Sequence, residues 1–301
     1  MIGSAGQSIL TPHSGPEHSI TTLWWVMFGG ACVGFSVIAL LLLLGWIRRN
    51  RAGDEALATR LVVILGIATP IVVLSALFIW SDVFVIRTTA APSPRSTQMT
   101  VHVIGHQWFW EIRYGKQAVA ANELHIPERT RVNVVGTTAD VIHSLWVPEL
   151  NRKIDLIPGR TNRVLLYADR PGTYLGQCSE FCGPQHAHME LTVVAEPRGR
   201  FDQWLRAQQQ PASPGLQLFA QKGCADCHEI RGTSAHAHVG PDLTHVASRR
   251  TLAAGIIPND RAHLAEWIRD PQDVKPGTRM PKLPLSPRDV RALVDYLEGL
   301  K

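Results

Sequence analysis

The stretch Cys178-Ser-Glu-Phe-Cys182-Gly-Pro-Gln-His186-Ala-His-Met189 decides how this chain is interpreted. It places two cysteines, an imidazole and a thioether within one tight loop. A blue-copper site takes one Cys, two His and a weakly bound axial Met, and the spacing Cys182-x3-His186-x2-Met189 supplies three of these ligands. The loop therefore predicts a copper site.

A further ligand has to come from elsewhere in the chain. His143, in the strand-like segment VIHSLWVP at 141–148, is the candidate, because such a strand can return beside the loop. Cys178 does not fit a site with one copper ion. Two soft thiolates can instead bridge two copper ions, each of which then needs one His and one weak ligand, such as the Met189 sulfur or a backbone carbonyl.

Two other interpretations of the cysteines stay open: a disulfide bond and a structural zinc site. Neither explains a Met at the axial spacing, and zinc sites usually space their paired cysteines by two residues. His188 is surplus to the ligand count, and we expect it to be a surface imidazole.

In these residues the chain resembles subunit II of the haem-copper cytochrome c oxidases. The resemblance implies a binuclear copper centre, CuA, with the following ligands: Cys178 and Cys182 bridge the two ions, His143 and His186 bind one each, and Met189 and the Glu180 carbonyl bind weakly. It also implies that the Glu180 carboxylate binds a magnesium ion shared with subunit I, and hard oxygen ligands suit that ion. The alternative for Glu180 is a solvated loop carboxylate.

The overall composition, 45% hydrophobic and 18% charged over 301 residues, is that of an ordinary globular protein of about two domains. The apolar residues are nevertheless segregated. Residues 23–47 contain no charge and would form a helix of about 37 Å, and residues 61–80 would add about 30 Å. Tryptophans lie near the ends of both runs. Two membrane-spanning helices are therefore predicted rather than a buried globular pair, with a kink at Pro70.

The orientation follows from the loop between the two runs, in which Arg48, Arg49, Arg51 and Arg60 outnumber Asp54 and Glu55. The positive-inside rule places this loop in the cytoplasm. The chain after residue 81 is then expected on the periplasmic side of a bacterial inner membrane. We recognise no cleavable signal at the start, and a longer precursor stays open. The net charge of +5 comes without a basic run, which argues against nucleic-acid binding.

Short alternating apolar runs fill residues 97–196, including TVHVI at 100–104, RVNVV at 131–135, RVLLY at 163–167 and ELTVV at 190–194. They predict an antiparallel β-sandwich. The family resemblance makes this an all-β cupredoxin-like Greek-key domain. GHQWFW at 105–110 matches the family's aromatic segment, so Trp108 matches its electron-entry tryptophan, the alternative being an ordinary strand aromatic. KIDLIPGR at 153–160 matches the family's loop facing subunit I.

Cys224-Ala-Asp-Cys227-His228 is the signature of covalent c-type haem attachment. Met280 is the only Met after residue 189, and we expect it to be the sixth iron ligand. Four histidines compete for that role: His236, His238, His245 and His263.

The flanks of the haem motif predict an all-α class I cytochrome c domain. Ser213-Pro214 would cap a first helix carrying Leu216 and Phe219. Ser286-Pro287 would start a last helix with an apolar stripe, and Gly299 would end it. The stripe is Val290, Leu293, Val294 and Leu297. We expect the two helices to cross over the haem.

The predicted domain order is an extracytoplasmic tail at 1–20, a transmembrane hairpin at 21–90, the CuA domain at 91–197, a linker at 198–213 and the cytochrome c domain at 214–301. The linker begins with a helical stripe of Phe201, Trp204 and Leu205, expected to pack locally, and continues as QQQPASPG.

Two one-electron centres without a nucleophile or substrate pocket indicate an electron conduit. The resemblance is to the caa-type oxidase subunit II with a fused cytochrome c. It implies transfer from a cytochrome c-type donor to haem c, to CuA and to subunit I, where oxygen is reduced to water with proton translocation. The implied partners are the other oxidase subunits, the donor and membrane lipid. A CuA-bearing nitric oxide reductase subunit and a copper-delivery protein stay open. A quinol oxidase subunit is excluded, because it lacks the copper ligands.

Overall fold

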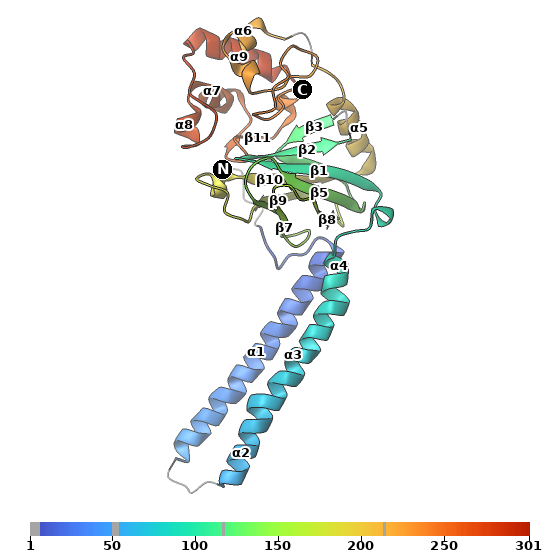
Figure 1. Cartoon of the computed structure of the whole chain (residues 1–301), viewed down its shortest axis with the longest axis vertical. Coiled ribbons are helices and arrows are strands. Elements are labelled where there is room, and N and C mark those ends of the chain that lie inside the picture. The colour runs from blue at the N-terminus through green and yellow to red at the C-terminus, as the bar shows by residue number, and fades with distance from the viewer. Residues whose placement is uncertain (1–6, 50–53, 116–117, 213–214) are drawn as a thin grey trace.

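The computed structural model describes residues 7–49, 54–115, 118–212 and 215–301. Two long helices lie side by side at one end of the molecule (Figure 1). The first is α1 (Gly15–Ile47). The second is continuous and comprises α2 (Glu55–Val63), the π-helical η1 (Ile64–Ala68), α3 (Thr69–Trp80), the π-helical η2 (Ser81–Ile86) and α4 (Arg87–Thr89). Both are long and apolar enough to cross a membrane, with mean hydropathies of 2.4 and 2.7 and exposed side chains in those windows.

The second long helix continues through Pro70, the position at which the sequence predicts a kink. Proline lacks the N–H that would bond to the preceding turn. The helix adopts the wider π geometry over Ile64–Ala68, and the Thr69 hydroxyl donates to the Ile64 carbonyl at 2.9 Å. The side-chain bond and the local change of helix type satisfy backbone groups without ending the helix.

The middle of the chain is a β-sandwich of two five-stranded sheets. The first sheet has the order β3 (Ala118–Ala121), β2 (Phe109–Tyr114), β1 (Met99–His106), β5 (Val132–Thr138), β8 (Asn162–Leu166). The second has the order β4 (Glu123–Pro127), β10 (Glu190–Glu196), β9 (Gly172–Cys178), β6 (His143–Trp146), β7 (Ile154–Leu156). Fully buried side chains such as Val103, Trp110, Leu124 and Leu191 fill the space between them. All four quoted apolar runs form strands, and the cupredoxin-like fold is confirmed.

The expectation of a wholly antiparallel sandwich is wrong for two strand pairs. β1 pairs with β5 in parallel, and so does β4 with β10. Parallel neighbours require a crossover connection, whereas strands joined by a hairpin are antiparallel. Between β1 and β5 the chain passes through the other sheet as β4, so it returns beside β1 in the same direction. Alternation along a strand carries no information on this long-range pairing.

Helix α5 (Arg198–Gln208) begins the segment predicted as a linker, and it packs on the sandwich. Phe201 is buried in the sandwich core, and Trp204 stacks on His125 with ring centroids 4.0 Å apart. The His125 ring also lies 3.1 Å from the Glu196 carboxylate and 3.8 Å from that of Glu123. The local packing expected of the apolar stripe is confirmed, so this part of the segment is a fixed helix.

The last part of the chain folds around its own core, which includes Phe219, Ile230 and Leu293. Its helices are α6 (Gln217–Gln221), α7 (Arg261–Arg269), α8 (Pro271–Val274) and α9 (Pro287–Glu298), with 3-10 turns η5 (Cys224–Asp226) and η6 (Val246–Ser248). A short strand pair, β11 (Thr251–Leu252) and β12 (Ile257–Pro258), adds a feature that the all-α prediction did not include. This domain lies at the end of the sandwich away from the long helices (Figure 1).

The two helix starts predicted in this domain have different outcomes. Helix α9 begins after Ser286, which forms a capping box with Asp289, and its predicted apolar stripe is buried. Helix α6 begins at Gln217, later than predicted, and Ser213 and Pro214 lie outside the described residues. The two helices are in contact through the rings of Phe219 and Tyr296, whose centroids are 6.2 Å apart.

Candidate copper and haem sites

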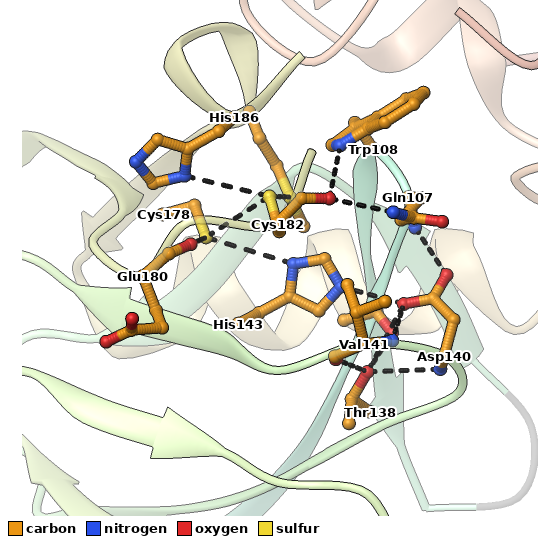
Figure 2. Close-up of polar contacts among 12 residues, drawn as sticks. Gln107, Trp108, Thr138, Asp140, Val141, His143, Cys178, Glu180, Cys182 and His186 are labelled. Carbon is orange, nitrogen blue, oxygen red and sulfur yellow. Dashed lines mark hydrogen bonds and ion pairs between the residues drawn. The ribbon is translucent and has the colours of Figure 1, made fainter. Parts of the chain in front are cut away.

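The copper loop connects the end of β9 to the start of β10, next to the start of β6. The Cys178 and Cys182 sulfur atoms lie 3.8 Å apart, and both thiols are free and buried (Figure 2). The His143 Nδ1 atom is 3.8 Å from Cys178 Sγ, and the His186 Nδ1 atom is 3.7 Å from Cys182 Sγ. Each thiol thus has its own imidazole neighbour.

Weaker donors complete this group of side chains. The Glu180 carbonyl oxygen lies 3.3 Å from Cys178 Sγ, and the Met189 sulfur lies 4.0 Å from Cys182 Sγ. Met189 is fully buried. The six residues of the predicted ligand set are therefore brought together. Two thiolates, two imidazoles and a thioether form a soft donor set that fits copper.

The two thiols affect each other's ionisation. Their mutual hydrogen bond outweighs burial and lowers the pKa of Cys178 to about 3, whereas the same contact together with burial raises the pKa of Cys182. One thiolate therefore forms readily. The second needs added positive charge nearby, which metal cations would supply on binding.

Asp140, a residue that the sequence analysis missed, orients the His143 ring. The His143 Nε2 atom is 2.9 Å from the Asp140 carboxylate, and the Gln107 backbone N–H donates to that carboxylate at 2.7 Å (Figure 2). An Nε2–H that donates to a carboxylate leaves Nδ1 free for a metal. Burial lowers the pKa of His143, but the hydrogen bonds to Cys178 and Asp140 outweigh it and raise the value overall.

Trp108 lies in the turn between β1 and β2, and its indole contacts the copper loop. Its Nε1–H donates to the Cys182 carbonyl at 3.0 Å, and the Gln107 side-chain amide donates to the same oxygen at 2.7 Å (Figure 2). Gly183, with φ +115°, permits this approach, because a Cβ there would lie 2.9 Å from Trp108 Cζ2. The indole is thus hydrogen bonded to the backbone of Cys182, one of the two cysteines of the loop.

In the cytochrome domain, a cavity is lined by the residues of the haem motif and by Met280. Cys224, Cys227 and His228 lie on one part of its wall, with apolar side chains around them. The His228 Nδ1–H donates to the Pro241 carbonyl at 2.8 Å, which leaves Nε2 free for the iron. Burial lowers the pKa of His228, so its ring is neutral at pH 7. Two thiols, a free imidazole nitrogen and a thioether around an apolar cavity fit a c-type haem.

Comparison with known proteins agrees with both sites. Residues 116–196 match the family model "Cytochrome C oxidase subunit II, periplasmic domain", and residues 212–301 match "Cytochrome c". Cytochrome c oxidase subunit 2 of Lycodon semicarinatus is 30% identical over 167 residues, which are 45% of this chain and 73% of that protein. This chain belongs to the cytochrome c oxidase subunit 2 family. Copper and haem binding follow from the two family matches.

A bacterial member of the subunit 2 family, that of Alkalihalophilus pseudofirmus, is 38% identical over 222 residues. The match covers 70% of this chain and 64% of that relative, so this chain spans less than two thirds of its length. Among solved structures, the periplasmic domain of subunit II of cytochrome oxidase from Bradyrhizobium japonicum is 29% identical. It covers 40% of this chain and 96% of its own, with a TM-score of 0.37.

Glu180 and His188 of the copper loop have side chains that are accessible to solvent. The Glu180 carboxylate lies 3.7 Å from the Lys153 ammonium and is nearly half exposed (Figure 2). It therefore faces the 153–160 segment. His188 is exposed, as expected of a surface imidazole, and its Nδ1 is 2.9 Å from the Gln185 side-chain oxygen.

The four histidines that competed with Met280 all lie elsewhere among the described residues. None of them lines the haem cavity. His236 and His238 are exposed, His245 bonds the carbonyls of Lys301 and Gln210, and His263 pairs with Asp260.

Proposed function

We propose that this chain is the electron-transfer subunit of a terminal respiratory oxidase. It would accept electrons from a cytochrome c-type donor at haem c and pass them through binuclear CuA to subunit I, for reduction of oxygen to water coupled to proton translocation. One observation carries the proposal: Trp108 lines the haem cavity and donates a hydrogen bond to the Cys182 carbonyl. The two candidate redox sites therefore share a side chain.

For the copper site, we assign Cys178 and Cys182 as bridging ligands and His143 and His186 as the ligands of one ion each. Met189 and the Glu180 carbonyl are the weak ligands. The support is the soft donor set and the contacts of 3.3–4.0 Å between its members. Asp140 holds the His143 tautomer, and burial of both thiols keeps water away from them.

For the haem site, Cys224 and Cys227 would form the covalent attachment, with His228 and Met280 as axial ligands. The support is that all four line one apolar cavity and that Pro241 leaves the His228 Nε2 free. When bound, haem and copper would each supply one-electron redox chemistry. Trp108 is the residue we assign to the contact between them.

The position relative to the membrane and to partners belongs to the same proposal. We assign the two long helices to a bacterial inner membrane, with the sandwich and the cytochrome domain on the periplasmic side. The C-terminal end of α1, which Arg48 follows in the chain, and the N-terminal end of α2 lie far from the sandwich, which agrees with a cytoplasmic loop (Figure 1). The Glu180 carboxylate is nearly half exposed, so its oxygen atoms are accessible to a magnesium ion shared with subunit I.

The test is to purify the complex that contains this chain and to follow its reduction. We expect near-infrared and electron paramagnetic resonance spectra of a binuclear, mixed-valence copper centre, and oxygen consumption driven by reduced cytochrome c. In stopped-flow experiments the haem should be reduced before the copper. A mononuclear copper spectrum would contradict the ligand assignment, and reduction of copper before haem would contradict the order of transfer. Nitric oxide reduction without oxygen consumption would favour the reductase alternative, which no family match supports.

A further inference from the structure

The cytochrome domain is joined to the sandwich by two groups of specific contacts. In one group, Arg250 donates from its backbone to the Glu123 carboxylate and from its side chain to the Thr173 hydroxyl, the latter at 2.6 Å. In the other group, the Gln185 side chain of the copper loop donates to the Pro276 carbonyl, and Arg279 donates to the Gln107 side-chain oxygen. The second group surrounds the turn that carries Trp108.

Lys275 lies in the middle of the second group and is almost fully buried, with 2% of its surface exposed. Its Nζ atom is 2.7 Å from the His188 carbonyl, 2.9 Å from the Ala253 carbonyl and 3.4 Å from the Trp108 carbonyl. Two of these acceptors belong to the sandwich and one to the cytochrome domain. A lysine ammonium has three donors and no acceptor, so three carbonyls match its hydrogen-bonding capacity.

This lysine is not part of an ordinary ion pair. Among the described residues no salt bridge includes Lys275, and the acidic side chain whose charge acts on it is Glu190. Burial lowers the pKa of Lys275 to about 8, which still leaves it protonated at pH 7. A buried ammonium is tolerated only when its donors are bonded. The contacts with both domains are therefore required to keep this charge in place.

The hairpin between β11 and β12 contains two alanines in an unusual backbone conformation. Ala253 and Ala254 adopt φ values of 54° and 61°, a left-handed conformation that residues with a Cβ rarely take. The Ala253 carbonyl accepts a hydrogen bond from Lys275 within the cytochrome domain, whereas the Ala254 carbonyl crosses the domain boundary and accepts from the Glu190 backbone N–H at 3.1 Å. Such backbone strain persists where the surroundings hold it. Here the surroundings are the sandwich and Lys275.

We propose that Lys275 is a positioning residue that holds the haem domain docked against the copper loop, so that the two redox domains act as one fixed unit. The inference rests on the proposed function, because it concerns the path from haem to copper. Lys275 contacts the backbone of Trp108 and of His188, which precedes the Met189 ligand. Loss of this contact would let the domains separate, and electron transfer between two sites falls steeply with distance.

The experiment compares Lys275→Met with Lys282→Met in the complete, metal- and haem-loaded complex. Lys282 is a matched control, because it lies in the same segment, carries the same charge and has an exposed side chain paired with Asp270. We measure transfer from haem to copper after flash reduction, the absorption spectra of both centres, and amide hydrogen exchange of segments 183–190 and 271–281. Lys275→Met should slow the transfer by about tenfold or more, because it leaves buried carbonyls without a donor.

In Lys275→Met, hydrogen exchange should rise in both segments while the two spectra stay unchanged, and Lys282→Met should match the wild type. Lys275→Gln, with two amide donors, should give an intermediate result, and it also serves if Lys275→Met does not load haem. Unchanged transfer and unchanged exchange in these variants would overturn the proposal. If the wild-type chain transfers no electron from haem to copper, the proposed function fails instead, and the exchange measurement still decides whether Lys275 holds the domains together.

Discussion

Gly183→Ala tests whether the contact between Trp108 and the copper loop matters for electron entry. Gly183 has a φ of +115°, and an added Cβ would lie 2.9 Å from Trp108 Cζ2 and 3.2 Å from the Gln107 side-chain nitrogen. Both of those side chains donate to the Cys182 carbonyl. The methyl group would therefore push the indole and the amide away from the loop.

The size of the effect follows from two contributions. Placing Ala at a positive φ costs about 1–3 kcal/mol. Losing or weakening the two hydrogen bonds to the Cys182 carbonyl adds about 0.5–1.5 kcal/mol for each bond. We expect the sandwich to lose about 2–6 kcal/mol in its free energy of unfolding. Transfer from haem to copper should slow as well, since the shared side chain is displaced.

Gly115→Ala is the matched control. Gly115 also has a positive φ, +63°, but an added Cβ would have nothing within 4 Å. This variant should show the backbone cost alone, about 1–2 kcal/mol, with normal electron transfer. Denaturant unfolding of both variants and flash-induced reduction of copper give the comparison. If Gly183→Ala matched Gly115→Ala in unfolding and transferred electrons at the wild-type rate, the role assigned to this contact would be refuted.

Three further predictions address other residues. Asp140→Asn should weaken copper binding by about 10- to 100-fold, because a neutral amide is a weaker acceptor for the His143 N–H than the carboxylate that orients it; a chelator titration checks this, and unchanged affinity would contradict it. Met280→Ala should slow oxidation of the donor while artificial donors still reduce copper directly, and stopped-flow kinetics like those of the wild type would contradict the axial assignment. His125→Gln should remove a pH dependence of stability. Burial lowers the pKa of His125, but its hydrogen bonds to two glutamates outweigh this and raise it above 6.5. The stabilisation of the fold by protonated His125 is therefore complete below pH 6.5 and is lost as the pH rises through the raised pKa of His125. The denaturant midpoint of the wild type should fall over that pH range, and the midpoint of His125→Gln should not.

Most of the candidate ligands could be proposed from the sequence because they lie at short spacings from one another. Cys178 to Met189 is a single loop, and the haem motif is a pentapeptide. His143 lies further off, but its strand-like surroundings indicated that it could return beside the loop, and it begins β6.

The residues that position these ligands could not be predicted in the same way. The Gln107 backbone meets Asp140 across 33 positions of sequence, and Lys275 meets the Trp108 carbonyl across 167. No periodicity or spacing connects such pairs. Gln107 and Asp140 are brought together by the folding of the sandwich, and Lys275 and Trp108 by the contact between the two domains. The local signal for Asp140, a carboxylate three residues before the candidate ligand His143, becomes meaningful only once the turn geometry is known.

The segment after the sandwich begins with a packed helix, and this packing bears on electron transfer between the two sites. From sequence, the cytochrome domain follows a polar linker, and a tethered donor would gain from the high effective concentration that a linker supplies. In the structure, α5 packs on the sandwich through Phe201 and Trp204, and sandwich residues Gln107, Trp108 and Phe109 line the haem cavity. One wall of that cavity therefore belongs to the copper domain. The rate of electron transfer between the sites then depends on the stability of the contacts between the two domains, and not on the effective concentration of a freely tethered domain. Lengthening the segment after α5 should therefore change this rate little while the interface contacts remain.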